Sequence, residues 1–173
     1  VFEVARRTEA DRVMMGWAEN RRWSHARAER PLAELTSRLP CDFLVVNDRG
    51  LDTARVLLST AGGPDSDLSA TVARALRSVA DAEVSLLHVV DSPEQRRTGE
   101  RFIGEWAIDH DLDDAEIIVD DSGDVEAAIE RAATEHTLLL LGATERGLLS
   151  RVLTETLHLD VVNKVECSVV LAE

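Results

Sequence analysis

The chain has 173 residues, of which 45% are hydrophobic, and 33 Asp and Glu residues outnumber 19 Lys and Arg residues to give a formal net charge of −14. This length and composition suit a folded protein with a sizeable core and exclude a disordered or fibrous chain. The acidic excess argues against binding to nucleic acid or directly to anionic lipid, because both need a cationic protein surface. No apolar run reaches the roughly 20 residues that span a membrane, and no secretory signal is visible, so we expect a cytoplasmic protein.

The basic residues are almost all arginine, and Lys164 is the only lysine. An acid-rich, lysine-poor composition is typical of proteins that work in concentrated salt, where screening weakens the repulsion between like charges. This pattern favours a halophilic source, and the arginine codons of a GC-rich genome are the alternative explanation. Cys41, Cys167 and five scattered histidines show neither a disulfide framework nor a metal-binding spacing, so we expect no metal site.

The first 47 residues follow the order helix, strand, helix and strand, with apolar runs at 12–16 and 41–46. Residues 48–54 contain Gly and Asp and no apolar run, which predicts a linker. From residue 55 onwards, short runs rich in Leu, Val and Ile predict five strands, at 55–60, 83–90, 115–119, 137–142 and 167–172.

Helices are expected between these strands. The first begins at an N-cap among residues 65–67, and its apolar face is formed by Leu68, Val72, Leu76 and Val79. The next begins with a capping box of Ser92 and Gln95, another is capped by Asp124, and the last covers about residues 156–165.

Strands that alternate with helices indicate right-handed βαβ crossovers and a parallel sheet covered on both faces. The predicted fold class is therefore α/β, flavodoxin-like or Rossmann-like, with an open five-stranded parallel sheet and helices on both faces.

A repeat without gaps appears at an offset of 126 residues. Thr8, Glu9, Gly16, Glu19, Ser24, Glu29 and Cys41 are each matched by the same residue type 126 positions later. The apolar runs at 12–16 and 41–46 also align with those at 137–142 and 167–172. We therefore expect residues 1–47 to be the C-terminal half of one unit, residues 48–54 a linker, and residues 55–173 a complete second unit.

The order of elements, together with "RVLLSTAGGPDSDLSATVARAL", "EVSLLHVVD" and "LLLLGATERGLLSRVLTETL", resembles the universal stress protein family. "STAGGP", "SLLHVVD" and "LGATERG" resemble more narrowly the paired stress-protein domains appended to amino-acid permease-type transporters of halophilic archaea. The resemblance implies that the final strands of two units pair antiparallel across a two-fold axis. We therefore expect self-association through residues 42–47 and 167–172, which would cover edges prone to aggregation.

The nucleotide-binding branch of this family has an Asp at the end of its first strand, where this chain has Ala61. That branch also has Gly-x2-Gly-x9-Gly-Ser/Thr after its fourth strand. Gly142 and Thr156 match the ends of this pattern, but Glu145 and Glu155 replace the two later glycines. In the N-terminal copy Gly16 is followed by Glu19 and Glu29 at the corresponding positions. The resemblance thus implies a degenerate nucleotide site, whose ligand-binding candidates are Ala61, Gly62, Gly63, Val90, Gly142, Thr144, Arg146, Gly147 and Thr156.

Two carboxylates in a phosphate-binding turn oppose phosphate binding. Like charges about 4 Å apart repel by roughly 4 kcal/mol at an effective dielectric of about 20, which is half of the roughly 8 kcal/mol of a micromolar complex. Glu29 and Glu155 also precede expected helix starts, where a carboxylate is favoured by the helix dipole and can take the place of a phosphate. Arg146 and Gly147 nevertheless keep ATP and AMP open as ligands.

The leading function is a non-catalytic regulatory or sensor module, the cytoplasmic part of an amino-acid or cation transporter. A free-standing ATP- or AMP-binding universal stress protein is the first alternative. A phosphoester hydrolase is the second, because "DHDLDD" at 109–114 and "DSGD" at 121–124 are rich in acids; a helix cap and a solvated loop explain them more simply. A GxSxG elbow and a GxGxxG turn are both absent.

Overall fold

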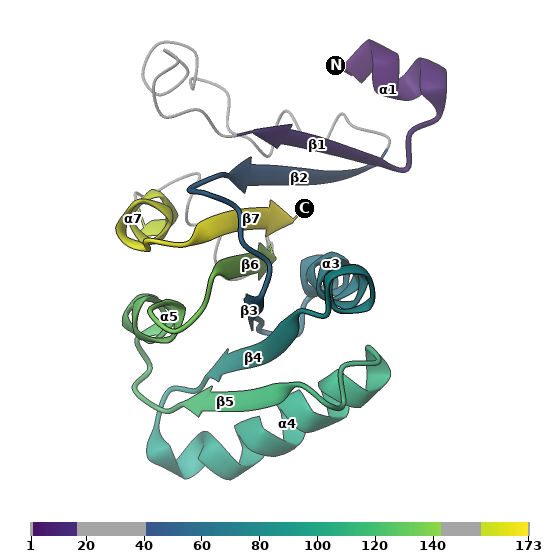
Figure 1. Ribbon diagram of the computed structural model, residues 1–173. Coiled ribbons are helices and arrows are strands. Elements are labelled where there is room, and N and C mark those ends of the chain that lie inside the picture. Colours follow the sequence, from purple (N-terminus) through teal and green to yellow (C-terminus); the bar gives the residue numbers. More distant parts are fainter. Residues whose placement is uncertain (1, 17–40, 143–156, 173) are drawn as a thin grey trace.

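The computed structural model describes residues 2–16, 41–142 and 157–172, in which seven strands form one sheet (Figure 1). The strands are β1 (Arg12–Gly16), β2 (Asp42–Asn47), β3 (Arg55–Ser59), β4 (Glu83–Val89), β5 (Glu116–Asp120), β6 (Leu138–Gly142) and β7 (Ser168–Ala172). The helices are α1 (Phe2–Thr8), α3 (Pro64–Ala80), α4 (Arg96–Asp109), α5 (Val125–Ala133) and α7 (Leu157–Lys164), with a short 3-10 helix η1 (Pro93–Gln95) before α4.

The sheet order is β1-β2-β7-β6-β3-β4-β5. All pairs among β7, β6, β3, β4 and β5 are parallel, which confirms the predicted five-stranded α/β sheet. The sheet is larger than these five strands, since β2 pairs antiparallel with β7 and β1 pairs parallel with β2. The outcome is a mixed sheet of seven strands in which segments 42–47 and 167–172 lie side by side within one chain.

The strand pairing follows the 126-residue offset. Each β1–β2 pair becomes a β6–β7 pair when 126 is added to both numbers; Arg12↔Asp42 thus corresponds to Leu138↔Ser168. The antiparallel pairing of β2 with β7 is symmetric under the same offset. Adding 126 to the β2 residue and subtracting 126 from the β7 residue converts the pair Leu44↔Ala172 into Val46↔Val170 and leaves Val45↔Leu171 unchanged. This register has the symmetry expected for a two-fold axis normal to the sheet at Val45 and Leu171.

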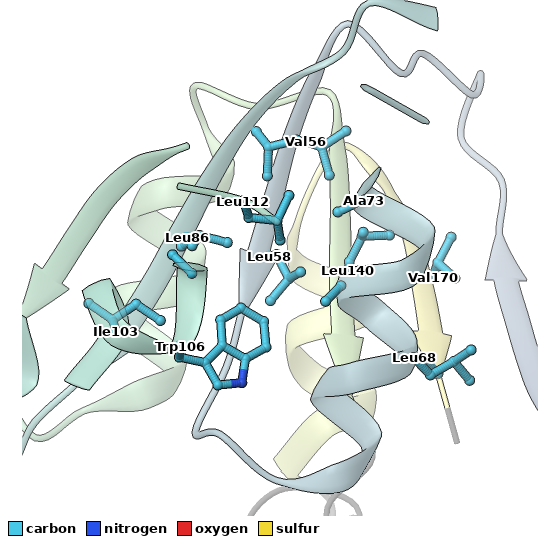
Figure 2. Packing of buried hydrophobic residues seen from close by; sticks show 14 of the residues in the cluster. Val56, Leu58, Leu68, Ala73, Leu86, Ile103, Trp106, Leu112, Leu140 and Val170 are labelled. Carbon is cyan, nitrogen blue, oxygen red and sulfur yellow. The ribbon is translucent and has the colours of Figure 1, made fainter. Parts of the chain in front are cut away.

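Two hydrophobic clusters cover the two faces of the sheet. Figure 2 shows the first, in which Leu58, Leu86 and Leu140 of the sheet pack against α3 and α4, with Ile103 and Trp106 from α4. The second contains side chains from α5 and α7, together with strand residues that point to the opposite face, including Leu57, Leu87, Leu139 and Val169. These nearly continuous apolar strands are buried on both sides, as in other helix-covered parallel sheets.

The starts of two helices differ from the sequence-based expectation. The N-cap of α3 is Gly63, because Pro64 takes the first helical position, where its missing N–H and fixed φ are no disadvantage. Ser92 forms no capping hydrogen bond, and the 3-10 turn η1 precedes α4.

Val79, expected on the buried face of α3, is 86% exposed in the last turn. By contrast, Asp124 caps α5 as predicted, because its carboxylate accepts a hydrogen bond from the N–H of Ala127 at 3.0 Å.

Candidate functional site

The order of the strands reverses between β3 and β6. The chain passes from β3 to β4 on one side and from β6 to β7 on the other. In open α/β sheets, ligands bind outside the carboxyl ends of the strands at such a switch point. The turn after β3, residues 60–63, and Gly142 at the end of β6 therefore define the candidate site.

The turn after β3 offers backbone groups rather than charged side chains. Ala61 is exposed at the position where the nucleotide-binding branch has a carboxylate. Gly62 has φ of +79°, which an L-residue adopts only with strain, and its N–H donates to the hydroxyl of Thr60 at 2.9 Å. Gly63 follows as the N-cap of α3 and has no side chain to satisfy the first N–H groups of the helix.

An aromatic pair from β4 and α4 packs against this turn. A Cβ added to Gly62 would lie 2.3 Å from the Cζ of Phe102, so the ring occupies the space directly beside the glycine. The ring of His88 lies 4.9 Å from that of Phe102, and its Nδ1–H donates to the carbonyl of Thr60 at 3.0 Å. No local pattern in the sequence predicts this contact. His88, a polar residue near the end of an apolar strand, was the available signal.

Val90, at the end of β4, is largely buried. Its side chain is 8% exposed, and α4 approaches so closely that a Cβ on Gly99 would lie 2.7 Å from Val90 Cγ1. The N–H of Val90 donates to the carbonyl of Asp120 at 2.8 Å, and its own carbonyl accepts from the N–H of Gly123 at 3.0 Å. The backbone of Val90 thus joins the ends of β4 and β5.

Two carboxylates at the carboxyl end of β5, Asp120 and Asp121, are bound to neighbouring arginines. Burial alone raises the pKa of Asp120, but hydrogen bonds from Ser122 and Arg131 outweigh it and lower that pKa below its ordinary value. Arg131 Nη2 lies 2.7 Å from Asp120 Oδ2. Arg96 Nη1 lies 2.9 Å from Asp121 Oδ2, and this hydrogen bond raises the pKa of Arg96. Within segment 121–124, Asp121 is thus paired with Arg96 at the start of α4, and Asp124 caps α5.

The rest of the predicted site lies outside the described residues. These positions are Thr144, Glu145, Arg146, Gly147, Glu155 and Thr156, together with Glu19 and Glu29 of the N-terminal copy. The structure therefore brings together Ala61, Gly62 and Gly63 in one turn, with Gly142 at the end of the strand next to β3. The charge-blocking role of the glutamates stays a prediction.

The described part of the chain has no group of three or more His, Cys, Asp or Glu side chains that could hold a metal ion. No described helix is long and apolar enough to cross a membrane. Cys41 and Cys167 are both free, half-buried thiols, and burial raises the pKa of Cys167.

Comparison with solved structures shows which known proteins share this architecture. A universal stress protein from Archaeoglobus fulgidus DSM 4304 matches 98% of this chain and 63% of its own length, with a TM-score of 0.57 and 16% identity. The chain has the universal stress protein fold. A universal stress protein solved in complex with cAMP matches 70% of this chain and 97% of its own length, with a TM-score of 0.54 and 17% identity.

The same fold occurs in a transporter. The cytoplasmic domain of a prokaryotic cation chloride cotransporter matches 93% of this chain and 62% of its own length, with a TM-score of 0.66 and 15% identity. The chain thus spans less than two thirds of the length of this protein and of the Archaeoglobus universal stress protein. No protein-family model and no curated protein matches the sequence.

Proposed function

We propose that this chain is a non-catalytic regulatory or sensor module that belongs to the cytoplasmic part of an amino-acid or cation transporter. The observation that carries this proposal is the likeness to the cotransporter cytoplasmic domain, which extends over 93% of the chain with a TM-score of 0.66. The acid-rich, lysine-poor composition agrees with the resemblance to transporter-appended domains of halophilic archaea. A source gene that encodes no membrane-spanning segments would remove the transporter part of the proposal.

The module consists of a complete unit at residues 55–173 and a partial unit at residues 1–47, joined by residues 48–54. The register supports this division, because β1 and β2 pair as β6 and β7 do, at a constant offset of 126 residues. The antiparallel seam between β2 and β7 then corresponds to the self-association surface of paired stress-protein units.

The nucleotide site of this module is degenerate. At the end of β3, Ala61 supplies no carboxylate, and the ring of Phe102 packs beside Gly62. Glu145 and Glu155 replace two glycines that phosphates would approach. We therefore expect no binding of ATP, AMP or cAMP by the unmodified chain at ligand concentrations up to about 1 mM.

Calorimetric titration in high salt with Mg²⁺ tests this site. The triple variant Ala61→Asp, Glu145→Gly, Glu155→Gly restores the family pattern and should gain ATP binding by at least about tenfold, roughly 1.4 kcal/mol. Glu9→Gly is the matched control, since Glu9 is exposed, distant in sequence from the turn after β6 and already at φ of +50°. A triple variant that binds no better than Glu9→Gly would show that the lost residues do not determine nucleotide binding.

The likeness to a universal stress protein solved with cAMP favours a second candidate, a free-standing nucleotide-binding protein. Micromolar binding of ATP, AMP or cAMP to the unmodified chain would select this candidate over a degenerate site. Release of phosphate from ATP or from p-nitrophenyl phosphate would instead select the phosphoester hydrolase.

A further inference from the structure

A hollow lies at the amino ends of β3, β4 and β5, at the edge of the sheet opposite the turn after β3. It has a volume of about 610 Å³, and ligand pockets commonly have volumes of about 300–1,000 Å³. Five carboxylates and two arginines line it, and all of its lining comes from described residues between 55 and 136. It is therefore separate from the candidate site at the carboxyl ends of β3 and β6.

Four polar side chains from three neighbouring strands line this hollow. Arg55 lies opposite Glu83 in the β3–β4 pair, and Ser85 lies opposite Glu116 in the β4–β5 pair. Because side chains alternate between the two faces of a strand, all four lie on the face of the sheet that holds the second cluster, with α5 and α7. The sheet thus presents one cation beside two carboxylates on the same face.

The backbone around these charges is fixed, whereas several of the charged groups are unpaired. Thr137 Oγ1 accepts a hydrogen bond from the N–H of Arg55 at 3.0 Å, and the N–H of Thr137 donates to the carbonyl of Arg55 at 2.8 Å. Within the part of the chain that the structure describes, the guanidinium of Arg55 and the carboxylates of Glu83 and Glu135 form no ion pair or hydrogen bond. Each of these groups can therefore bind a group of opposite charge on a ligand.

Contacts of the other charged residues decide which groups stay available. Arg77 is paired with Asp114, so Arg55 supplies the guanidinium that is free among the described residues lining the hollow. Ser85 is 6% exposed, and its hydroxyl donates to Glu116 Oε2 at 3.2 Å, which orients that carboxylate. Since carboxylates outnumber arginines in the lining, a ligand with a net positive charge is favoured.

We propose that this hollow binds a free α-amino acid with a cationic side chain, such as lysine or arginine. The ligand's carboxylate pairs with Arg55, whose planar guanidinium can donate two parallel hydrogen bonds to it. Its α-ammonium group pairs with Glu83 on the adjacent strand, and its side-chain cation pairs with Glu116. The site depends neither on nucleotide binding nor on the proposed transporter, because every group that it uses belongs to this chain.

Two other classes of cation fit the lining less well. A polyamine has no carboxylate for Arg55 and would be repelled by that guanidinium. A metal ion needs several ligands close together, and the described residues contain no group of three or more His, Cys, Asp or Glu side chains that could hold one.

Calorimetric titration of the full chain with L-lysine in high salt tests the site, and cadaverine is the analogue that lacks the carboxylate. We expect L-lysine to bind with a dissociation constant below about 1 mM, and cadaverine to bind at least about tenfold more weakly. Arg55→Gln should weaken the binding of L-lysine about tenfold without weakening that of cadaverine, because only L-lysine has a carboxylate for the guanidinium. Glu83→Gln should weaken the binding of both ligands.

Arg101→Gln is the matched control, since Arg101 is an exposed arginine on α4 outside the lining of the hollow. Because the substituted side chains are exposed, all three variants should keep the urea midpoint of the unmodified chain. The proposal is overturned if L-lysine does not bind at up to about 10 mM, or if Arg55→Gln weakens its binding no more than Arg101→Gln does. It is also overturned if cadaverine binds as tightly as L-lysine, or if Glu83→Gln weakens neither ligand.

Discussion

The strand pairs β1–β2 and β6–β7 have the same register but different surroundings. Each begins its first strand 30 residues before its second, as Arg12↔Asp42 and Leu138↔Ser168 show. β6 is enclosed by β3, β7 and α3, and its residues are all buried, whereas the residues of β1 are half-buried or exposed. Equivalent backbone pairing therefore does not ensure equivalent burial, because burial needs an opposing surface on each face.

The largest expected effect separates the two strands directly. Leu140→Ala should lower the free energy of unfolding by about 2–5 kcal/mol, because it leaves a cavity in the α3-covered cluster. Met14→Ala, at the equivalent position, should change it by less than about 0.5 kcal/mol. Urea unfolding followed by circular dichroism measures both. Equal losses for the two variants would mean that Met14 is buried in solution and would break the comparison.

The turn after β3 has no counterpart in residues 1–47. Substitution of Gly62 tests how much this turn contributes to the free energy of unfolding. Gly62→Ala should destabilise the chain by about 1–3 kcal/mol, because φ is +79° and the new methyl group meets Phe102. Gly50→Ala, at φ of +89° with no atom within 4 Å of the added Cβ, should show only the backbone cost of about 1 kcal/mol. The difference between the two should disappear when Phe102 is also changed to Ala; if it persists, the ring is not its cause.

A smaller effect concerns how the segment after β2 is attached to the C-terminal unit. Arg49 Nη2 donates to the carbonyls of Val162 and Asn163, at 3.2 and 3.3 Å, in the last turn of α7. Arg49→Gln should cost about 0.5–1.5 kcal/mol, because the terminal carbonyls of α7 lose a charged donor. Thermal unfolding measures this against Arg101→Gln, an exposed change on α4. A cost no larger than that of the control would mean that Arg49 does not attach this segment.

The smallest expected effect is a pH dependence of the free energy of unfolding that comes from Asp120 on β5, the strand at the opposite end of the sheet from β1. The folded chain lowers the pKa of Asp120. The carboxylate of Asp120 therefore stabilises the fold at pH values above its pKa in the unfolded chain, and this stabilisation is lost as the pH falls through its lower pKa in the folded chain. The free energy of unfolding should therefore decrease less between about pH 5 and about pH 3 in Asp120→Asn than in the unmodified chain. Asp113→Asn, an exposed change outside this hydrogen-bond network, is the control. Parallel pH profiles for all three proteins would contradict the assignment.

The sequence predicted the five-stranded sheet well because its signal is local. Short apolar runs such as those of β3 and β6 are too short for helices and are bounded by turn residues, so their positions agree with the structure to within about one residue. Asp124 was predicted as a cap for the same reason, since capping needs only a carboxylate near the first N–H groups. The predicted N-cap of α3 among residues 65–67 was wrong, because Pro64 favours the first helical position and so places the N-cap at Gly63.

The candidate site was predicted less completely. The glycines after β3 and at the end of β6 were found from the family pattern, and the structure describes them. The contact of Phe102 with Gly62 joins residues 40 positions apart and depends on how α4 packs across the sheet, which no local pattern contains. The close approach of α4 to Val90 at Gly99 is not predicted by the sequence for the same reason.

The sequence by itself determined which segments form strands and which strands correspond across the 126-residue offset, because periodicity and spacing are written along the chain. Only the tertiary structure decided that Leu140 is enclosed and Met14 is left at an edge, although the backbones around them pair alike. The physical reason is that hydrophobic burial depends on the surfaces that meet a side chain, and those surfaces come from residues far away in the sequence.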